Sequence, residues 1–142
     1  MLTVQHLLER KGRAVRAVGP DDPVLEAIRA MAEHHVGALL VMHGGALLGI
    51  VSERDYARKV ILLGRSSADT PVKEIMTSPV ITVTPLTTLD ECMRLVSTHG
   101  VRYLPVVENA RAVAVVSIGD LVKATIEEQQ HTIEQLESYI HS

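Results

Sequence analysis

The chain has 142 residues, of which 46% are hydrophobic, 22% charged and 2% aromatic, a length that suits one compact domain or two small halves sharing a core. The net charge of -3, the single cysteine and the lack of Trp and Phe argue against a nonspecific nucleic-acid binder, an internal disulfide and a stacking platform for bases. No apolar run approaches the ~20 residues of a membrane-spanning helix and the first ten residues lack the order of a signal peptide, so we expect a cytoplasmic protein that contacts neither membrane nor nucleic acid.

Apolar spacing and turn residues predict the same order of elements twice along the chain. Each copy begins with a short strand and continues with a helix, whose start is marked by Asp21-Asp22-Pro23 or by Thr87-Thr88, residues that cap or open helices. A β-hairpin and a closing helix follow. The predicted ranges are strands 14–18 and 80–83, helices from 24 to about 35 and from 89 to about 100, hairpin strands 38–42, 47–51, 103–107 and 112–116, and closing helices 53–63 and 119–139.

This order reflects an internal repeat. Residues 18–60 align with residues 83–125 at a constant offset of 65 without a gap, and eleven of the 43 pairs are identical. Many other pairs are apolar with apolar, such as Ile28 with Met93. A unit of about 65 residues holds too little core to be stable alone. We therefore expect the two halves to pack their sheets together.

The residues around each hairpin resemble a CBS motif: Val36-Gly-Ala-Leu-Leu-Val41 and Leu48-Gly-Ile-Val-Ser-Glu-Arg-Asp55, then Val101-Arg-Tyr-Leu-Pro-Val-Val107 and Val115-Val-Ser-Ile-Gly-Asp120. The resemblance spans roughly residues 2–125 and implies a stand-alone CBS pair, or Bateman module. Its fold is α+β (an α/β-type CBS pair), with two tandem β-α-β-β-α repeats packed sheet to sheet in pseudo-two-fold symmetry. The first motif is expected at 1–65, the second at 66–126 and a C-terminal helix extension at 127–142. In this family adenine nucleotides bind in two clefts between the sheets.

Two Ser-x-x-Asp elements, Ser52 to Asp55 and Ser117 to Asp120, fall where a strand is predicted to end and a helix to begin. One interpretation is a capping box, in which the serine caps the first turn and the acid accepts a backbone N–H. The other is nucleotide binding, because a helix N-terminus attracts phosphate and a carboxylate one turn later can accept both hydroxyls of a ribose. The resemblance favours nucleotide binding, since this element is the ribose-binding signature of CBS pairs.

The resemblance makes each cleft a composite of both copies. Arg102 either reaches the phosphate or lies solvated at a helix–strand junction. It aligns with Gly37, and Arg54 aligns with Gly119, so the two clefts are not equivalent. The residues implied for one cleft are Arg16, Val36, Gly37, Ala38, Ser117 and Asp120. Those implied for the other are Ser52, Arg54, Asp55, Thr77, Ile81, Val101, Arg102 and Tyr103.

A basic stretch near the start has three possible roles. Arg10, Lys11, Arg13 and Arg16 place four of the 14 cations within seven residues. They can be solvated, they can form a phosphate-facing wall of the first cleft, or they can contact nucleic acid, which the negative net charge opposes.

Histidine and cysteine positions predict structural roles. His34 and His99 end equivalent helices, where a protonated ring suits the negative dipole end. Adjacent His34 and His35 point about 100° apart on a helix, so no metal site is expected. Cys92 falls beside the apolar stripe of its helix and is predicted to fill the core rather than act as a nucleophile.

The C-terminal segment carries an apolar stripe. Ile126, Ile133 and Ile140 are seven residues apart, and Val122 and Leu136 lie on the same face. A helix with such a face needs a cover, so the segment either folds back on its own module or packs on another subunit. We favour a homodimer.

We therefore expect a regulatory, signal-transducing module rather than an enzyme. An adenine nucleotide, with AMP or NAD favoured and ATP, ADP or S-adenosylmethionine possible, would bias two arrangements of the halves, and the response would pass to an unidentified effector or through the dimer. One alternative is a ligand-free interaction scaffold. The other is a nucleotide-processing enzyme with Asp55 or Asp120 as general base, which needs a second convergent group that the motifs do not supply.

Overall fold

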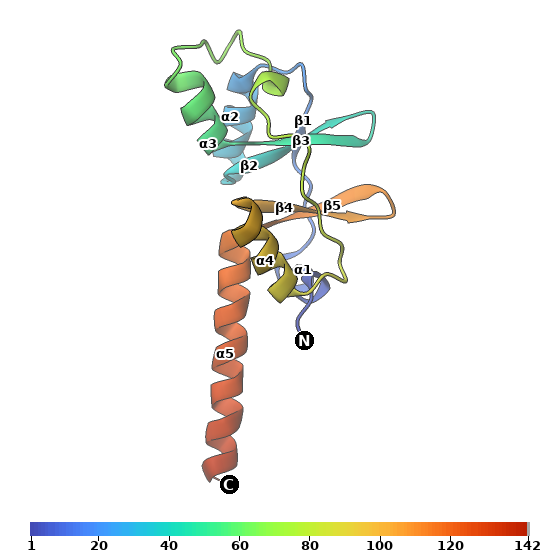
Figure 1. Ribbon diagram of the computed structural model, residues 1–142, viewed down its shortest axis with the longest axis vertical. Helices are drawn as coiled ribbons and strands as arrows, with labels where there is room; N and C mark the ends of the chain where they lie inside the picture. The colour runs from blue at the N-terminus through green and yellow to red at the C-terminus, as the bar shows by residue number, and fades with distance from the viewer. Residues whose placement is uncertain (142) are drawn as a thin grey trace.

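Two β-sheets face each other, and helices lie on the outer side of each (Figure 1). The computed structural model describes residues 1–141; Ser142, the last residue of the predicted C-terminal extension, lies outside the described residues. Helix α1 (Val4–Lys11) comes first in the chain. The first half then contains β1 (Ala17–Val18), α2 (Val24–His34), β2 (Ala38–His43), β3 (Ala46–Ser52), α3 (Glu53–Tyr56) and a π-helical turn (Ala57–Ile61). The second half contains a 3-10 turn (Val72–Glu74), α4 (Leu89–His99), β4 (Tyr103–Glu108), β5 (Arg111–Ser117) and α5 (Ile118–His141).

The two halves repeat with the offset seen in the sequence. Helix α4 and strands β4 and β5 each begin and end 65 residues after α2, β2 and β3. Both hairpins are antiparallel, and their pairing register shifts at equivalent places, after Val41 and after Val106. The predicted α+β fold of two tandem repeats is confirmed.

The strand expected at the start of each half is shorter than predicted. In place of 14–18, only the two residues of β1 pair with β2, in parallel. In place of 80–83, Val83 alone pairs, through a parallel bridge to Val106. Pro79 and Pro85 flank that segment, and a proline has no N–H to donate to a ladder. The two prolines therefore limit how far the ladder can extend on either side.

The closing helices also differ from the prediction. After the first hairpin, the helix expected over 53–63 is four residues of α3 followed by the π-helical turn. After the second hairpin, α5 is continuous from Ile118 to His141. Helices α2 and α4 end near the predicted positions, at the left-handed residues His35 (φ 54°) and Gly100 (φ 63°).

Helix α1 was not among the predicted elements, and it belongs to the second half. The N–H of Val4 donates to the carbonyl of Thr87 at 2.8 Å, and the N–H of Gln5 donates to the carbonyl of Pro85 at 2.9 Å. Val4, Leu7 and Leu8 are buried in the core of that half. The chain then crosses to the first half to form β1, as Figure 1 shows.

Each half has its own core beneath its helices. The first consists of Val24, Ala27, Met31, Leu39, Val41, Val51, Val60, Val72 and Ile75. The second consists of Val4, Leu7, Leu8, Val83, Leu89, Cys92, Val96, Leu104, Val106, Ala114, Val116 and Leu121.

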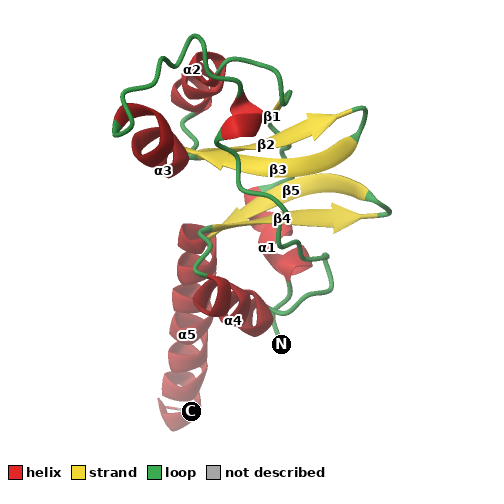
Figure 2. Cartoon of the chain, turned by 45° about the horizontal axis from the view of Figure 1, so that its top comes forward, coloured by secondary structure: helices red, strands yellow, loops and turns green. Residues whose placement is uncertain are grey.

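A third apolar layer lies between the sheets. Strand residues alternate between faces, so Leu39 and Val41 point to the helices while Leu40, between them, points to the other sheet. Leu40 is fully buried and lies outside the cluster of its own half. Figure 2 shows the two hairpins stacked, with β3 next to β5. The expected packing of sheet on sheet is therefore present.

Candidate functional site

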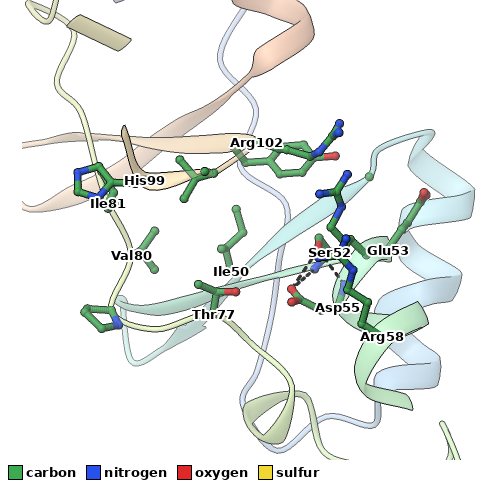
Figure 3. A pocket seen from close by; sticks show the side chains of 16 residues that line it. Ile50, Ser52, Glu53, Asp55, Arg58, Thr77, Val80, Ile81, His99 and Arg102 are labelled. Carbon is green, nitrogen blue, oxygen red and sulfur yellow. Dashed lines mark hydrogen bonds between the residues drawn. The ribbon is translucent and has the colours of Figure 1, made fainter. Parts of the chain in front are cut away.

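A cavity of about 590 Å³ opens between the two halves. All eight residues predicted for the cleft of the first Ser-x-x-Asp element line it: Ser52, Arg54, Asp55, Thr77, Ile81, Val101, Arg102 and Tyr103. Figure 3 shows Arg102 across the cavity from Ser52 and Asp55. One wall comes from the end of β3 and the start of α3, and another from the α4–β4 turn. Residues of the segment 77–81 complete the lining.

Ser52 and Asp55 form a complete capping box at the start of α3. The Asp55 N–H donates to Ser52 Oγ at 3.1 Å, and Asp55 Oδ2 accepts from the Ser52 N–H and from Ser52 Oγ, each at 3.0 Å. Asp55 Oδ1 pairs with Lys59 Nζ at 3.1 Å, and the Asp55 side chain is 13% exposed. The two interpretations of the motif are therefore compatible, because the box holds the carboxylate still at the cavity wall.

Gly37 provides the space that Tyr103 occupies. A Cβ on Gly37 would overlap the Tyr103 hydroxyl, so a larger residue there would displace the tyrosine. Burial and the charge of Glu53 raise the pKa of Tyr103, with Arg102 and Arg54 opposing, which keeps the hydroxyl protonated. Gly37 was expected in the other cleft, but it lines this cavity.

Three arginines line the cavity without a partner among residues 1–141. Arg54, Arg58 and Arg102 make no side-chain hydrogen bond or ion pair with the part of the chain that the structure describes. Arginine binds phosphate through a fixed fork of donors, so the wall can hold a polyanion. Arg58 was missed in the sequence. Its signal was the spacing of four from Arg54, which places both on one helical face.

The second Ser-x-x-Asp element has a different environment. Its capping box is present, with the Asp120 N–H donating to Ser117 Oγ at 3.0 Å and the Ser117 N–H to Asp120 Oδ2 at 2.8 Å. Lys11 Nζ also donates to Asp120 Oδ2, at 2.6 Å. Burial opposes ionisation of Asp120, but the hydrogen bonds from Lys11 and Ser117 and the charge of Lys11 together lower its pKa.

The other residues expected around Asp120 lie outside the 590 Å³ cavity. Ser117, Asp120, Arg16, Val36 and Ala38 are absent from its lining. Val36 packs on the core of the first half, and Ala38 pairs with Ser52 at the end of the hairpin. The Arg16 carbonyl accepts the Leu40 N–H at 3.0 Å, and its side chain is exposed.

The basic stretch is held mostly by acidic and polar groups of the second half and α1. Arg10 pairs with Glu127, Lys11 pairs with Asp120, and Arg13 lies 3.5 Å from Glu108 and 2.8 Å from Gln5. These partners lower the positive charge that the stretch can offer to a phosphate. The arginines of the cavity have no such partners, so they are the stronger anion-binding group.

Cys92 fills the core of the second half, as predicted. It is fully buried, and desolvation, with a smaller contribution from the charge of Glu91, raises the pKa of its thiol to about 11. The thiolate is the reactive form of cysteine. We therefore expect Cys92 of the folded protein to resist a chromogenic thiol reagent at pH 8, and to react within the mixing time in denaturant. Fast reaction of the folded protein would contradict this burial.

Residues 1–141 contain no cluster of His, Cys, Asp and Glu that could hold a metal ion.

Comparison with known families decides the relationship. Residues 12–61 and 72–127 match the family described as CBS domain. The chain belongs to the CBS domain family. The resemblance found in the sequence is thus confirmed, and the matched segments give two CBS motifs. CBS domain pairs are regulatory modules.

Individual CBS proteins match along most of the chain. It is 39% identical over 147 residues to the "CBS domain-containing protein CBSX3, mitochondrial" of Arabidopsis thaliana, covering 97% of this chain and 71% of that protein. A putative signal-transduction protein with CBS domains from Burkholderia ambifaria MC40-6 has a TM-score of 0.85 and 48% identity, covering 89% of this chain and 96% of that one. The CBS domain pair of protein MJ0100, solved with 5′-methylthioadenosine and S-adenosylmethionine, shares the fold at a TM-score of 0.80 and 22% identity, covering 90% and 98%.

Within residues 1–141, no helix combines the length and the apolar character that crossing a membrane requires.

Proposed function

We propose that this protein is a regulatory module that binds an adenine nucleotide in the 590 Å³ cavity between its CBS motifs. The observation that carries the proposal is that Asp55 and three arginines line the same cavity. Among the described residues, the three arginines have no side-chain partner. The volume falls within the ~300–1,000 Å³ of small-molecule sites. The module would pass its response to a second copy of the chain or to an effector protein.

Each part of an adenine nucleotide has a matching surface in the cavity. The Asp55 carboxylate can accept the ribose hydroxyls, as it is fixed by the capping box. Arg54, Arg58 and Arg102 can pair with phosphate. Apolar groups such as Val101 supply a face for the base. AMP and NAD share this adenosine handle, and the CBS pair of protein MJ0100 holds adenosine-containing ligands in the same fold.

Lys11 makes the Asp120 cleft the weaker candidate. A ribose there has to share Asp120 Oδ2 with a lysine 2.6 Å away. Asp55 also has a lysine partner, but at 3.1 Å and on the oxygen opposite the cap. We therefore infer one working nucleotide site per chain, at Asp55.

A thermal-shift panel with AMP, ADP, ATP, NAD, NADH and S-adenosylmethionine tests the proposal, using Asp55→Asn and Asp120→Asn as a matched pair. A ligand at 100 times its Kd stabilises by about 2.7 kcal/mol, or very roughly 5–10 °C here. We expect at least one nucleotide to shift the wild type and Asp120→Asn, but not Asp55→Asn. Asparagine keeps an oxygen for the cap and removes the charge.

Two results would overturn the proposal. Absence of a shift for every nucleotide would favour the interaction scaffold, and a shift lost only in Asp120→Asn would move the site to the other cleft. Product formation from any bound nucleotide during incubation would instead show an enzyme.

A further inference from the structure

The last part of α5 projects from the body of the molecule without any cover. Figure 1 shows the helix extending well past α1 and α4. After Glu127, every residue up to His141 is exposed. An isolated helix of 12–15 residues is only marginally stable in water, so this segment needs packing to stay helical. We call the segment from Val122 to His141 the stalk.

The stalk carries an apolar stripe on a face that its own module does not use. The stripe consists of Val122, Ile126, Ile133, Leu136 and Ile140, which are 43%, 59%, 47%, 58% and 74% exposed. Helix α5 packs on the core through Leu121 and Ala124. At 3.6 residues per turn, the stripe is centred about 100° around the helix from Leu121. The alternative that the stripe folds back on its own module is therefore wrong.

We propose that a second copy of the chain covers this stripe, with the two stalks packed antiparallel. This inference specifies the homodimer named above and does not depend on nucleotide binding. The stripe follows the a and d positions of a heptad, with Ile126, Ile133 and Ile140 at a and Val122 and Leu136 at d, the spacing by which two helices interlock. Gln129 holds the remaining d position.

Antiparallel packing places every stripe residue in one consistent register. Val122 lies opposite the partner's Ile140, Ile126 lies opposite the partner's Leu136, and Gln129 lies opposite the partner's Ile133. These layers span about 27 Å of helix. The same register is self-complementary, as a two-fold interface must be.

Charge selects antiparallel over parallel packing. Lys123 and Glu137 flank the stripe on the same side, at the two ends of the stalk, and neither makes an ion pair within residues 1–141. In the antiparallel register each Lys123 meets the partner's Glu137, which gives two ion pairs by symmetry. In a parallel pair Lys123 and Glu137 stay at opposite ends and gain no such contact. The antiparallel order also places the positive N-terminal end of each helix dipole beside the negative C-terminal end of the other.

The first test measures mass by light scattering over a range of protein concentrations. We expect the full chain to have twice its 15.5 kDa mass at high concentration, and Ile133→Glu to raise the dimer Kd about 100-fold or more, because two charges enter the interface core. Gln135→Glu adds the same charge on another face and serves as the control. Since Ile133 is exposed in the single chain, its substitution leaves the fold intact, as circular dichroism would check.

The second test reads the register by disulfide formation. Ile126→Cys and Leu136→Cys chains should cross-link when mixed one to one, while each alone stays un-cross-linked; buried Cys92 does not compete. In addition, Lys123→Glu should weaken the dimer about five- to tenfold, and Lys123→Glu with Glu137→Lys in one chain should restore it.

Three outcomes would overturn the inference: a monomer at every concentration, a dimer unaffected by Ile133→Glu, or cross-linking of Ile126→Cys with itself, which is the parallel arrangement. Nucleotide-induced thermal shifts of Ile133→Glu, measured alongside, report on the cavity independently of the stalk.

Discussion

Arg102→Ala is expected to weaken nucleotide binding about 10- to 150-fold while leaving the free energy of unfolding nearly unchanged. Arg102 is exposed at the cavity wall and has no side-chain partner in the described part of the chain. Its removal therefore costs the folded protein little. A hydrogen bond to a charged group contributes about 1.5–3 kcal/mol, which sets the expected loss of affinity.

Isothermal titration measures this loss, and Arg111→Ala is the matched control. Arg111 is also exposed, but it starts β5 and lies away from the cavity lining. We expect Arg111→Ala to bind like the wild type. If Arg102 pairs with phosphate, raising the salt concentration should weaken the wild type more than Arg102→Ala. Equal affinity of wild type and Arg102→Ala for every nucleotide would remove Arg102 from the site.

Leu104→Ala is expected to lower the free energy of unfolding by about 2–5 kcal/mol, the usual cost of removing a buried leucine. Leu104 is completely buried: it is 0% exposed and lies in the core of the second half. It follows Tyr103 directly on β4, so the loss also loosens the strand that carries the cavity wall. For a protein with a typical 5–15 kcal/mol of stability, this is a large fraction.

Urea unfolding followed by circular dichroism gives the value. Leu86→Ala provides the control, because Leu86 is 82% exposed and its removal should change stability by less than about 0.5 kcal/mol. A loss below about 1 kcal/mol for Leu104→Ala would mean that the second core rearranges to fill the space.

Local sequence signals predicted most of the fold because the helices and hairpins form between residues that are close together in the sequence. The hairpins follow from alternating apolar residues around turn residues, and their register follows from the turns. The repeat then fixed the equivalence of the two halves, since an ungapped offset leaves no freedom in matching Ser52 with Ser117. The leading strand of the second half was overestimated because its β-prone side chains hide a limit of the backbone: Pro79 and Pro85, on either side of it, have no N–H to donate.

The candidate site was predicted more unevenly. Six of the eight residues predicted for the Asp55 cleft come from short segments that the repeat aligns, and the other two, Thr77 and Ile81, were placed there by the family resemblance alone. The contact of Lys11 with Asp120 joins residues 109 positions apart, and no periodicity connects them. In the first motif the matching carboxylate is served by Lys59, four residues away. The position that corresponds to Lys59 in the second motif is Ala124, so a lysine from α1 takes its place.

The docking of α1 on the later half of the chain affects how the protein is made. Residues 2–11 leave the ribosome before their partners Thr87, Leu89 and Glu127 are made. Until then the side chains of Val4, Leu7 and Leu8 have no core to enter, while every residue of the first core, which ends at Ile75, has already been made. A fragment that starts at residue 66 would lack the same three side chains. The second core is therefore completed only when residues 4–8 and residues 83–121 are both present.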